Sequence, residues 1–333
     1  MKFGLLTYDI GPSGKFNVGD HIQSLAAKQY IPKVDSMIKR EHLNTLNLKD
    51  RTSVIMNGWY TQHPQNWPPE DFLNPFFVSF HLNSSYAEKI LNKPENVQYL
   101  RKYAPIGCRD KGTVKYLEKY GIDAYYSSCL TTTLDLKYKS EEKNEDILIV
   151  DVLYKDDLKL QYKDYPKSII SDIISGNIFK IGKRKKTIKS LIPKEILKKA
   201  KYLTHTYYGK DYNEEEQFKL GEDLLHKYAK AKLVITSRIH VALPCLALGT
   251  PVVFIAGGGL FRESELSRLK GTIEHLNIIT TEKINLDSSI SKNINILDVN
   301  NMDWNNISNP KSYLEYANKL KEACFSFVEK VNK

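Results

Sequence analysis

Residues 233–255 read LVITSRIHVALPCLALGTPVVFI and hold two short apolar runs on either side of a longer one. The short runs, 233–236 and 252–255, are rich in β-branched residues, which is typical of buried strands. Residues 239–248 are long enough for a helix, and Gly249 and Pro251 follow where a helix should stop. A strand, a helix and a second strand in this order form the unit of a parallel sheet. The stretch therefore predicts an α/β fold.

The same region raises the question of a membrane span, because residues 241–261 carry no charge. That length is enough to cross a bilayer. However, Pro244, Gly249 and the glycines at 257–259 divide the stretch into short pieces. Helix, turn, buried strand and glycine loop fit these breaks better than one spanning helix does.

Apolar strand-like runs alternate with amphipathic helical runs along the rest of the chain. A polar, charged segment at 137–146, KYKSEEKNED, interrupts this alternation and is interpreted as a domain linker. We therefore predict two Rossmann-like, doubly wound lobes that face a cleft. The expected units are an acceptor-side lobe at 1–140, a donor-side lobe at 146–305, and a closing helix at 311–333 that packs back on the first lobe. The expected strands are 3–8, 54–57, 76–81, 106–109, 124–127, 147–152 and 202–206, and the expected helices are 20–30, 111–120, 214–231 and 311–331.

Length and composition support this interpretation. A chain of 333 residues is about twice the usual size of one domain. Its four cysteines lie far apart without a CxxC pair, which argues against a disulfide framework or a zinc knuckle. The first residues resemble a strand more than a signal peptide, because an Asp follows a short apolar run. We expect a cytoplasmic protein without a metal or a resident cofactor.

The formal net charge of +10 favours anionic partners. Much of the excess lies at 180–201, where ten Lys and Arg residues are opposed only by Glu195. One interpretation is a solvated face of the protein. The other is a surface for an anionic membrane leaflet, because apolar residues are interleaved with the basic ones. Nucleic acid is not expected, since no recognition motif accompanies the charge.

Polar residues follow three of the expected strands, where ligands of parallel sheets bind. Residues 11–20, GPSGKFNVGD, place Asn17 and Asp20 at a helix start, although Asp20 could simply cap the helix. Arg109 precedes Asp110 at the next such junction, where a guanidinium beside exposed backbone N–H groups suits an anion. Asp110 could likewise be only a helix cap.

The third junction, VITSRIH, gives the clearest signal. Arg238, with Ser237 and Ile239 beside it, would hold a carboxylate or phosphate at the helix N-terminus. His240 in the same turn could exchange a proton with the bound group, or it could be a satisfied core histidine.

These motifs resemble the polysaccharide pyruvyltransferase family. The resemblance rests on Asn17–Val18–Gly19–Asp20, on Arg109–Asp110, and on Arg238–Ile239–His240 followed by ALGTP at 247–251. It implies a fold like the B-type glycosyltransferases, phosphoenolpyruvate as donor substrate, and a ketal on a sugar as product. The implied catalytic residues are His240 and Asp20, and the implied donor-binding residues are Arg238, Arg109, Ser237 and Ile239, with Lys15 or Arg262 as further cations.

The acceptor would be a sugar or oligosaccharide, free or lipid-linked. Trp59, Tyr60 and Trp67, in an expected loop at 59–69, could stack on a sugar ring or simply pack that loop. Asn17 and His81, which ends an expected strand, are further candidate acceptor contacts.

The chain also departs from the family pattern. It has NGWY at 57–60 where many relatives have a glycine cluster, and SSCLT at 127–131 where many have Asp-Pro-Ala. Either Ser128 or Thr131 replaces the missing Asp, or the chemistry has changed. Two alternative functions follow: a glycosyltransferase that uses a nucleotide sugar, and a catalytically silent saccharide-binding protein of a glycan assembly system.

Overall fold

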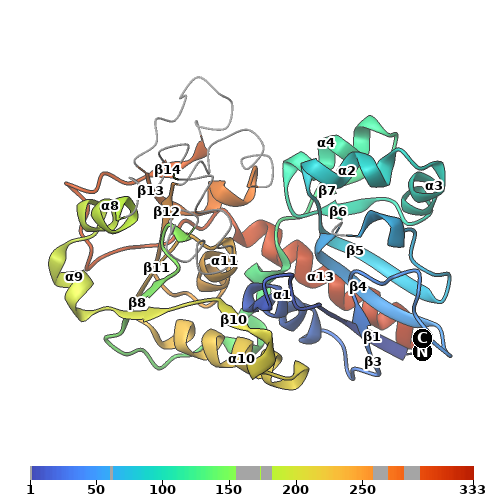
Figure 1. Cartoon of the computed structure of the whole chain (residues 1–333), viewed down its shortest axis with the longest axis horizontal. Helices are drawn as coiled ribbons and strands as arrows, with labels where there is room; N and C mark the ends of the chain where they lie inside the picture. The colour runs from blue at the N-terminus through green and yellow to red at the C-terminus, as the bar shows by residue number, and fades with distance from the viewer. Residues whose placement is uncertain (1, 61–62, 155–172, 174–181, 258–268, 281–292) are drawn as a thin grey trace.

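The computed structural model describes residues 2–60, 63–154, 173, 182–257, 269–280 and 293–333. Two six-stranded parallel sheets form the framework (Figure 1). Their strand orders are β3-β1-β4-β5-β6-β7 and β14-β13-β12-β11-β8-β9. The predicted two-lobed α/β fold is confirmed.

The first sheet comes from the N-terminal part of the chain and carries helices on both faces. Its register is parallel throughout, with Gly4 opposite Ser36 on one side and Val54 on the other. Its elements are β1 (Lys2–Thr7), α1 (Val18–Lys28), β3 (Ser36–Lys39), β4 (Thr52–Tyr60), η1 (Pro64–Asn66), β5 (Leu73–Leu82), α2 (Ser84–Leu91), α3 (Pro94–Lys102), β6 (Ile106–Cys108), α4 (Lys111–Lys119), β7 (Ala124–Tyr126), η2 (Leu130–Thr133) and α5 (Asp135–Tyr138).

The second sheet is built around residues 233–255. Strand β11 lies between β8 and β12, with Val234 opposite Leu148 and Val252. The elements of this half are β8 (Ile147–Val150), α8 (Lys183–Leu191), α9 (Lys194–Lys199), β9 (Lys201–Leu203), η5 (Gly209–Asp211), α10 (Glu214–Lys230), β11 (Leu233–Thr236), α11 (Ile239–Ala247), β12 (Val252–Ala256), η6 (Thr272–His275), β13 (Asn277–Thr280), β14 (Asn295–Ile296) and α13 (Leu314–Asn332).

One core joins the two sheets. Alternate residues of the central strands, such as Ile55 of β4 and Val234 of β11, point into it. The helices α1, α10, α11 and α13 fill the space between the sheets together with η2. Smaller apolar clusters cover the outer faces, one under α2, α3 and α4 and the other under α8 and α9. Because both faces of each sheet are buried, the strands are apolar on both sides.

The closing helix α13 lies along the first sheet (Figure 1). Phe327 of α13 stacks on Phe76 of β5, with ring centroids 4.8 Å apart. Phe325 meets Tyr30 edge to face, and Lys321 donates to Asp135 at 2.6 Å. The last helix of the chain thus contacts elements from its first half.

Two expected elements differ from the structure. The expected strand at 202–206 is wrong: it is split into β9 and β10 (Thr206–Tyr208). Strand β10 leaves the large sheet and pairs antiparallel with β2 (Lys15–Asn17), which joins the two halves. The expected loop at 59–69 is also wrong at its start, because β4 continues to Tyr60 after a shift in register between Met56 and Gly58.

The uncharged stretch at 241–261 contains part of α11 and the strand β12, and residues 258–261 lie outside the described part of the chain. Among the described residues, no helix is long and apolar enough to cross a membrane.

Candidate active site

A cavity of about 280 Å³ lies where the carboxyl ends of the two sheets face each other. The first sheet and its helices contribute Asn17, Asp20, Gln23, Trp59, His81, Asn83 and Arg109. The second contributes Tyr154, His205, Ser237, Arg238, Ile239, His240, Phe254 and Leu269. Nine of the ten site residues predicted from the sequence therefore line one cavity, and Tyr60 does not.

Arg238 is held rigidly at the end of β11. Its Nε donates to Asp151 Oδ2 at 3.0 Å, and its Nη2 donates to Thr206 Oγ1 at 2.9 Å. The guanidinium lies over the ring of Tyr154, 3.7 Å from the ring centroid. These contacts fix the plane of the guanidinium, which is the arrangement that two-point recognition of an anion needs.

Asp151 does not line the cavity but holds Arg238 in place, and it was not predicted from the sequence. It follows β8 directly, with φ of +46°, and it also accepts a hydrogen bond from the backbone N–H of His205 at 2.9 Å. A positive φ is costly for a residue other than glycine, so the position is held by its surroundings. The signal in the sequence was a charged residue immediately after a buried strand. Asp151 follows β8 in the way that Arg109 follows β6 and Arg238 follows β11.

Arg238 occupies the N-cap position of α11, and His240 lies in the first turn, where its φ and ψ of −111° and 25° depart from helical values. The first turn of α1 approaches His240 closely: a Cβ added to Gly19 would lie 3.2 Å from the Cβ of His240. Such a distance is tighter than ordinary van der Waals contact, which explains a glycine at this position. The helix starts carrying Asp20 and His240 are thus packed against each other.

The end of α1 that faces the cavity is organised by polar contacts. Asn17 caps the helix by accepting from the N–H of Gly19 at 3.2 Å, so the cap is Asn17 and not Asp20. Gln23 donates to Asp20 Oδ1 at 3.2 Å and accepts from Arg109 Nη1 at 3.3 Å. Gln23 therefore links the acidic and the basic group of this wall.

A buried arginine supports Asp20 from behind. Arg40 Nη1 lies 3.9 Å from Asp20 Oδ1, and Arg40 Nε donates to Glu41 at 2.8 Å. The guanidinium also lies over the rings of Tyr8 and Trp59. Burial acts to lower the pKa of Arg40, but the carboxylates of Asp20 and Glu41 hold that pKa above its usual value. Arg40 is thus a fixed cation beside Asp20.

Trp59 and Tyr60 are neighbours in β4, but their side chains lie on opposite faces of the sheet. Successive side chains of a strand point to opposite faces. Trp59 lines the cavity. Tyr60 is fully buried in the outer core, with its ring near those of Trp67 and Phe80. Trp67 is also buried, so neither Tyr60 nor Trp67 is placed to stack on a bound sugar.

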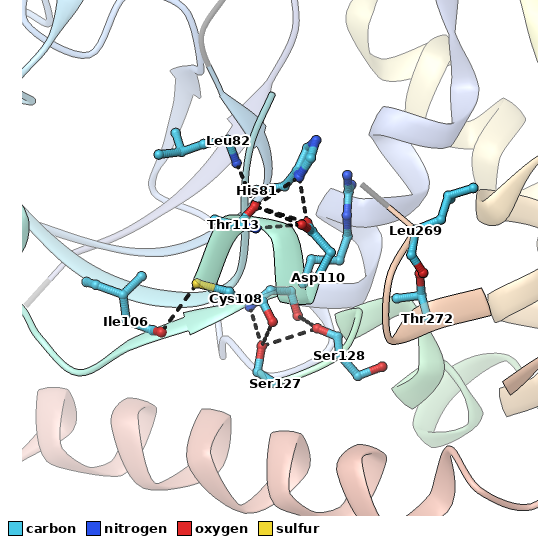
Figure 2. A network of polar contacts seen from close by, with 12 residues as sticks. His81, Leu82, Ile106, Cys108, Asp110, Thr113, Ser127, Ser128, Leu269 and Thr272 are labelled. Atoms are coloured by element: carbon cyan, nitrogen blue, oxygen red, sulfur yellow. Dashed lines mark hydrogen bonds and ion pairs between the residues drawn. The ribbon is translucent and has the colours of Figure 1, made fainter. Parts of the chain in front are cut away.

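His81, at the end of β5, pairs with Asp110 (Figure 2). Its Nδ1 lies 2.6 Å from Asp110 Oδ2 and 3.2 Å from Thr113 Oγ1. Asp110 also caps α4 by accepting from the N–H of Thr113 at 2.8 Å. Burial acts to raise the pKa of Asp110, but His81, Arg109 and the N–H of Thr113 together hold that pKa below its usual value. Asp110 is therefore a carboxylate that both caps a helix and orients a histidine.

His205 also lines the cavity and was not predicted. Its Nε2 lies 2.7 Å from the hydroxyl of Tyr228. Burial, and secondarily the charge of Arg238, lowers the pKa of His205 to about 3. His205 is therefore a neutral imidazole at ordinary pH. It lies in the short irregular segment between β9 and β10, where no local pattern marks a site.

Ser128 and Thr131, the candidates for replacing the family's Asp, are fully buried and do not line the cavity. The carbonyl of Ser128 accepts from Ser79 at 2.8 Å, and Thr131 contacts the Sγ of Cys129 (Ser128 is shown in Figure 2). Among the described lining residues, the only carboxylate is Asp20.

Of the other candidate cations, Lys15 lies in β2 over the ring of Tyr208 and does not line the cavity. Arg262 lies outside the described residues. Within the described ranges, no group of three or more His, Cys, Asp or Glu side chains could hold a metal ion.

Fold and site together define a class: a two-lobed α/β protein with a cavity between its sheets, whose described lining residues include two arginines and three histidines. The sequence profile described as polysaccharide pyruvyl transferase matches residues 17–259. The chain belongs to the polysaccharide pyruvyl transferase family.

Comparisons with curated proteins and with solved structures add little to this family assignment. No curated protein matches the chain. A solved structure of a functionally uncharacterised protein from Klebsiella pneumoniae is 13% identical and has a TM-score of 0.42. The match covers 79% of this chain and 86% of that one.

Proposed function

We propose that this protein transfers the pyruvyl group of phosphoenolpyruvate to two hydroxyls of one sugar and so forms a pyruvate ketal in a surface polysaccharide. The observation that carries the proposal is the presence of Arg109 and Arg238, from different sheets, in the wall of one cavity. Phosphoenolpyruvate has a carboxylate and a phosphate close together, and it therefore needs several fixed positive groups.

Arg238 is the first of these groups, with Ser237 and Ile239 on the same turn. Two of its five N–H groups donate to Asp151 and Thr206, and the other three make no hydrogen bond to the described residues. Arg109 provides the second charge across the cavity. The exposed N–H groups at the start of α11 add to the attraction for an anion.

The chemistry then needs a proton donor. Protonation of the methylene carbon of phosphoenolpyruvate makes C2 electrophilic, one sugar hydroxyl attacks C2, phosphate leaves, and the second hydroxyl closes the ketal. His240 is the proposed general acid, because it shares the first turn of α11 with Arg238. Asp20, Asn17 and Trp59 would bind and orient the acceptor on the opposite wall.

The test offers phosphoenolpyruvate with methyl galactosides, mannosides and N-acetylhexosaminides and measures phosphate release. Thermal-shift titrations with phosphoenolpyruvate and with nucleotide sugars run in parallel. Phosphate release that depends on one sugar supports the proposal. A response to a nucleotide sugar alone would replace it with the glycosyltransferase, and a response to saccharide alone would replace it with the silent binding protein.

We also propose that the surface of α8 and α9 contacts an anionic membrane leaflet, where a lipid-linked acceptor would be found. Both helices cover the outer face of the second sheet, on the side away from the first sheet (Figure 1). Their exposed basic residues, together with the residue that starts β9, are Lys183, Lys185, Lys186, Lys189, Lys194, Lys198, Lys199 and Lys201. Within the described ranges, only Lys201 of this set has an ion-pair partner, Asp146 at 2.7 Å.

Each such lysine near an anionic bilayer contributes about 1 kcal/mol of binding free energy. We expect sedimentation with phosphatidylcholine–phosphatidylglycerol vesicles, but not with phosphatidylcholine alone, and loss of sedimentation at high salt. Reversing Lys185 and Lys186 to Glu should weaken sedimentation, whereas reversing Lys115 and Lys119 on α4 should not. Equal sedimentation of all variants would contradict this proposal and support the interpretation of these residues as a solvated face.

A further inference from the structure

His81 and Asp110 form a buried pair whose contacts fix the orientation of the histidine ring. His81 lies at the end of β5 and lines the cavity, yet only 2% of it is exposed. Asp110, at the start of α4, is 1% exposed. Two strand ends of the first sheet therefore place a carboxylate behind a histidine that faces the substrate space.

The contacts determine which ring nitrogen carries the proton. An ionised carboxylate only accepts hydrogen bonds, and Asp110 Oδ2 lies 2.6 Å from His81 Nδ1. Nδ1 is therefore protonated in the neutral ring, and Nε2 is the basic nitrogen. Figure 2 shows the second ring nitrogen of His81 pointing away from Asp110.

Thr113 fixes both members of the pair. Its hydroxyl lies 3.1 Å from each oxygen of Asp110 and 3.2 Å from His81 Nδ1, and it accepts from the N–H of Leu82. The carboxylate cannot rotate away without losing the cap of α4. A histidine oriented by a buried carboxylate is the arrangement that general bases use.

The geometry points to His81 as the general base that accepts the proton of the attacking sugar hydroxyl, with Asp110 as its positioning residue. This inference rests on the proposed function. In the first step His240 gives a proton to the methylene carbon, the hydroxyl oxygen bonds to C2, and its proton moves to His81 Nε2. In the second step the bond from C2 to the phosphate oxygen breaks and the phosphate takes the proton from His81. The second hydroxyl then bonds to C2, and its proton restores His240.

This assignment gives the two histidines opposite protonation states at the start of the reaction, His240 charged and His81 neutral. Activity should therefore fall on the acid side as His81 becomes protonated. Asp110 stabilises the imidazolium, so removal of its charge should move that fall to lower pH. Among the described residues, the other charged and titratable groups that line the cavity are Asp20, Arg109, Tyr154, His205, Arg238 and His240.

The experiment uses the full chain with phosphoenolpyruvate and the methyl glycoside that the wild type converts. For His81→Gln we expect kcat to fall by about 10²–10⁴-fold, with the dissociation constant of phosphoenolpyruvate nearly unchanged. For Asp110→Asn we expect a lower kcat and an acid limb shifted to lower pH. His275→Gln serves as the control, because His275 is also buried but does not line the cavity.

Wild-type kcat in His81→Gln, or an equal loss of donor affinity and kcat, would overturn the assignment. An acid limb that stays in place in an active Asp110→Asn variant would do the same. These failures differ from failure of the proposed function, in which the wild type itself releases no phosphate. In that case the assignment of His81 as general base is refuted together with the proposed function.

Discussion

Replacement of Arg238 by Ala tests the donor site most directly, and the structure separates its two effects. The first is on the donor, because a charge-assisted contact to a carboxylate or phosphate is lost. Such contacts are worth about 1.5–3 kcal/mol, which is roughly ten- to hundred-fold in affinity. The second is on the fold, because Asp151 loses an ion pair in which the two side chains are 15% and 13% exposed.

The loss of stability should be modest. Asp151 keeps the hydrogen bond from the backbone N–H of His205 at 2.9 Å, so its carboxylate is not left without a donor. We expect the free energy of unfolding to fall by about 1–3 kcal/mol, the range for a buried group that loses one partner. Arg238→Lys should retain more affinity than Arg238→Ala but less than the wild type, since an ammonium cannot reproduce the planar contacts to Asp151 and Thr206.

Calorimetric titration with phosphoenolpyruvate measures the affinity, and urea denaturation measures the stability of the same samples. A folded Arg238→Ala variant that binds phosphoenolpyruvate within about twofold of the wild type, less than 0.5 kcal/mol, would refute the placement of the donor. A variant that does not fold would identify Arg238 as chiefly structural, and Arg238→Lys would then have to carry the affinity measurement.

Three further predictions follow from neighbouring residues. His240→Asn should keep the donor affinity but lose about 10²–10⁴-fold in kcat, measured by phosphate release, because proton transfer matters in the transition state; a parallel loss of affinity would make His240 a binding residue. Gly19→Ala should lower kcat by pushing His240 while stability changes little, since Ala is favoured over Gly in a helix by about 1 kcal/mol; unchanged kcat would show that the contact yields without consequence. His205, whose pKa is lowered to about 3 in the fold, binds its proton more readily when unfolded. Its contribution to stability is therefore complete above about pH 6.5 and falls by about 1.4 kcal/mol per unit as the pH drops toward 3; urea denaturation at several pH values should show a shallower slope for His205→Gln, and an equal slope would contradict the assignment.

The sequence was most informative where a polar residue follows a buried strand. The carboxyl ends of parallel strands meet at one edge, so Arg109, His81 and Arg238 could be expected to converge without knowledge of their distances. Asp151 obeys the same rule at the end of β8 and could have been found by it. His205 could not, because its place depends on where β9 ends and β10 turns toward β2.

Tyr60 shows that the alternation of side chains predicts which face a residue lies on only when the length of the strand is also known. The strand β4 was expected to end at residue 57, but pairing with β5 resumes at Gly58, whose φ is +103°. That irregularity decides that Trp59 faces the cavity and Tyr60 the core. Periodicity over the four residues 54–57 does not reveal a continuation of this kind.

The core shared by the two sheets has a consequence for how the chain gains and loses its structure. Helices α1, α10, α11 and α13 bury apolar side chains in a single cluster, so each half loses the hydrophobic contacts of this shared core when the other unfolds. Heating should therefore melt both halves in one cooperative transition, with calorimetric and van't Hoff enthalpies in agreement. A fragment cut within the charged segment 137–146 would expose a large apolar face and aggregate. Exchange of one half with that of a relative would need the helices of both partners to be redesigned together.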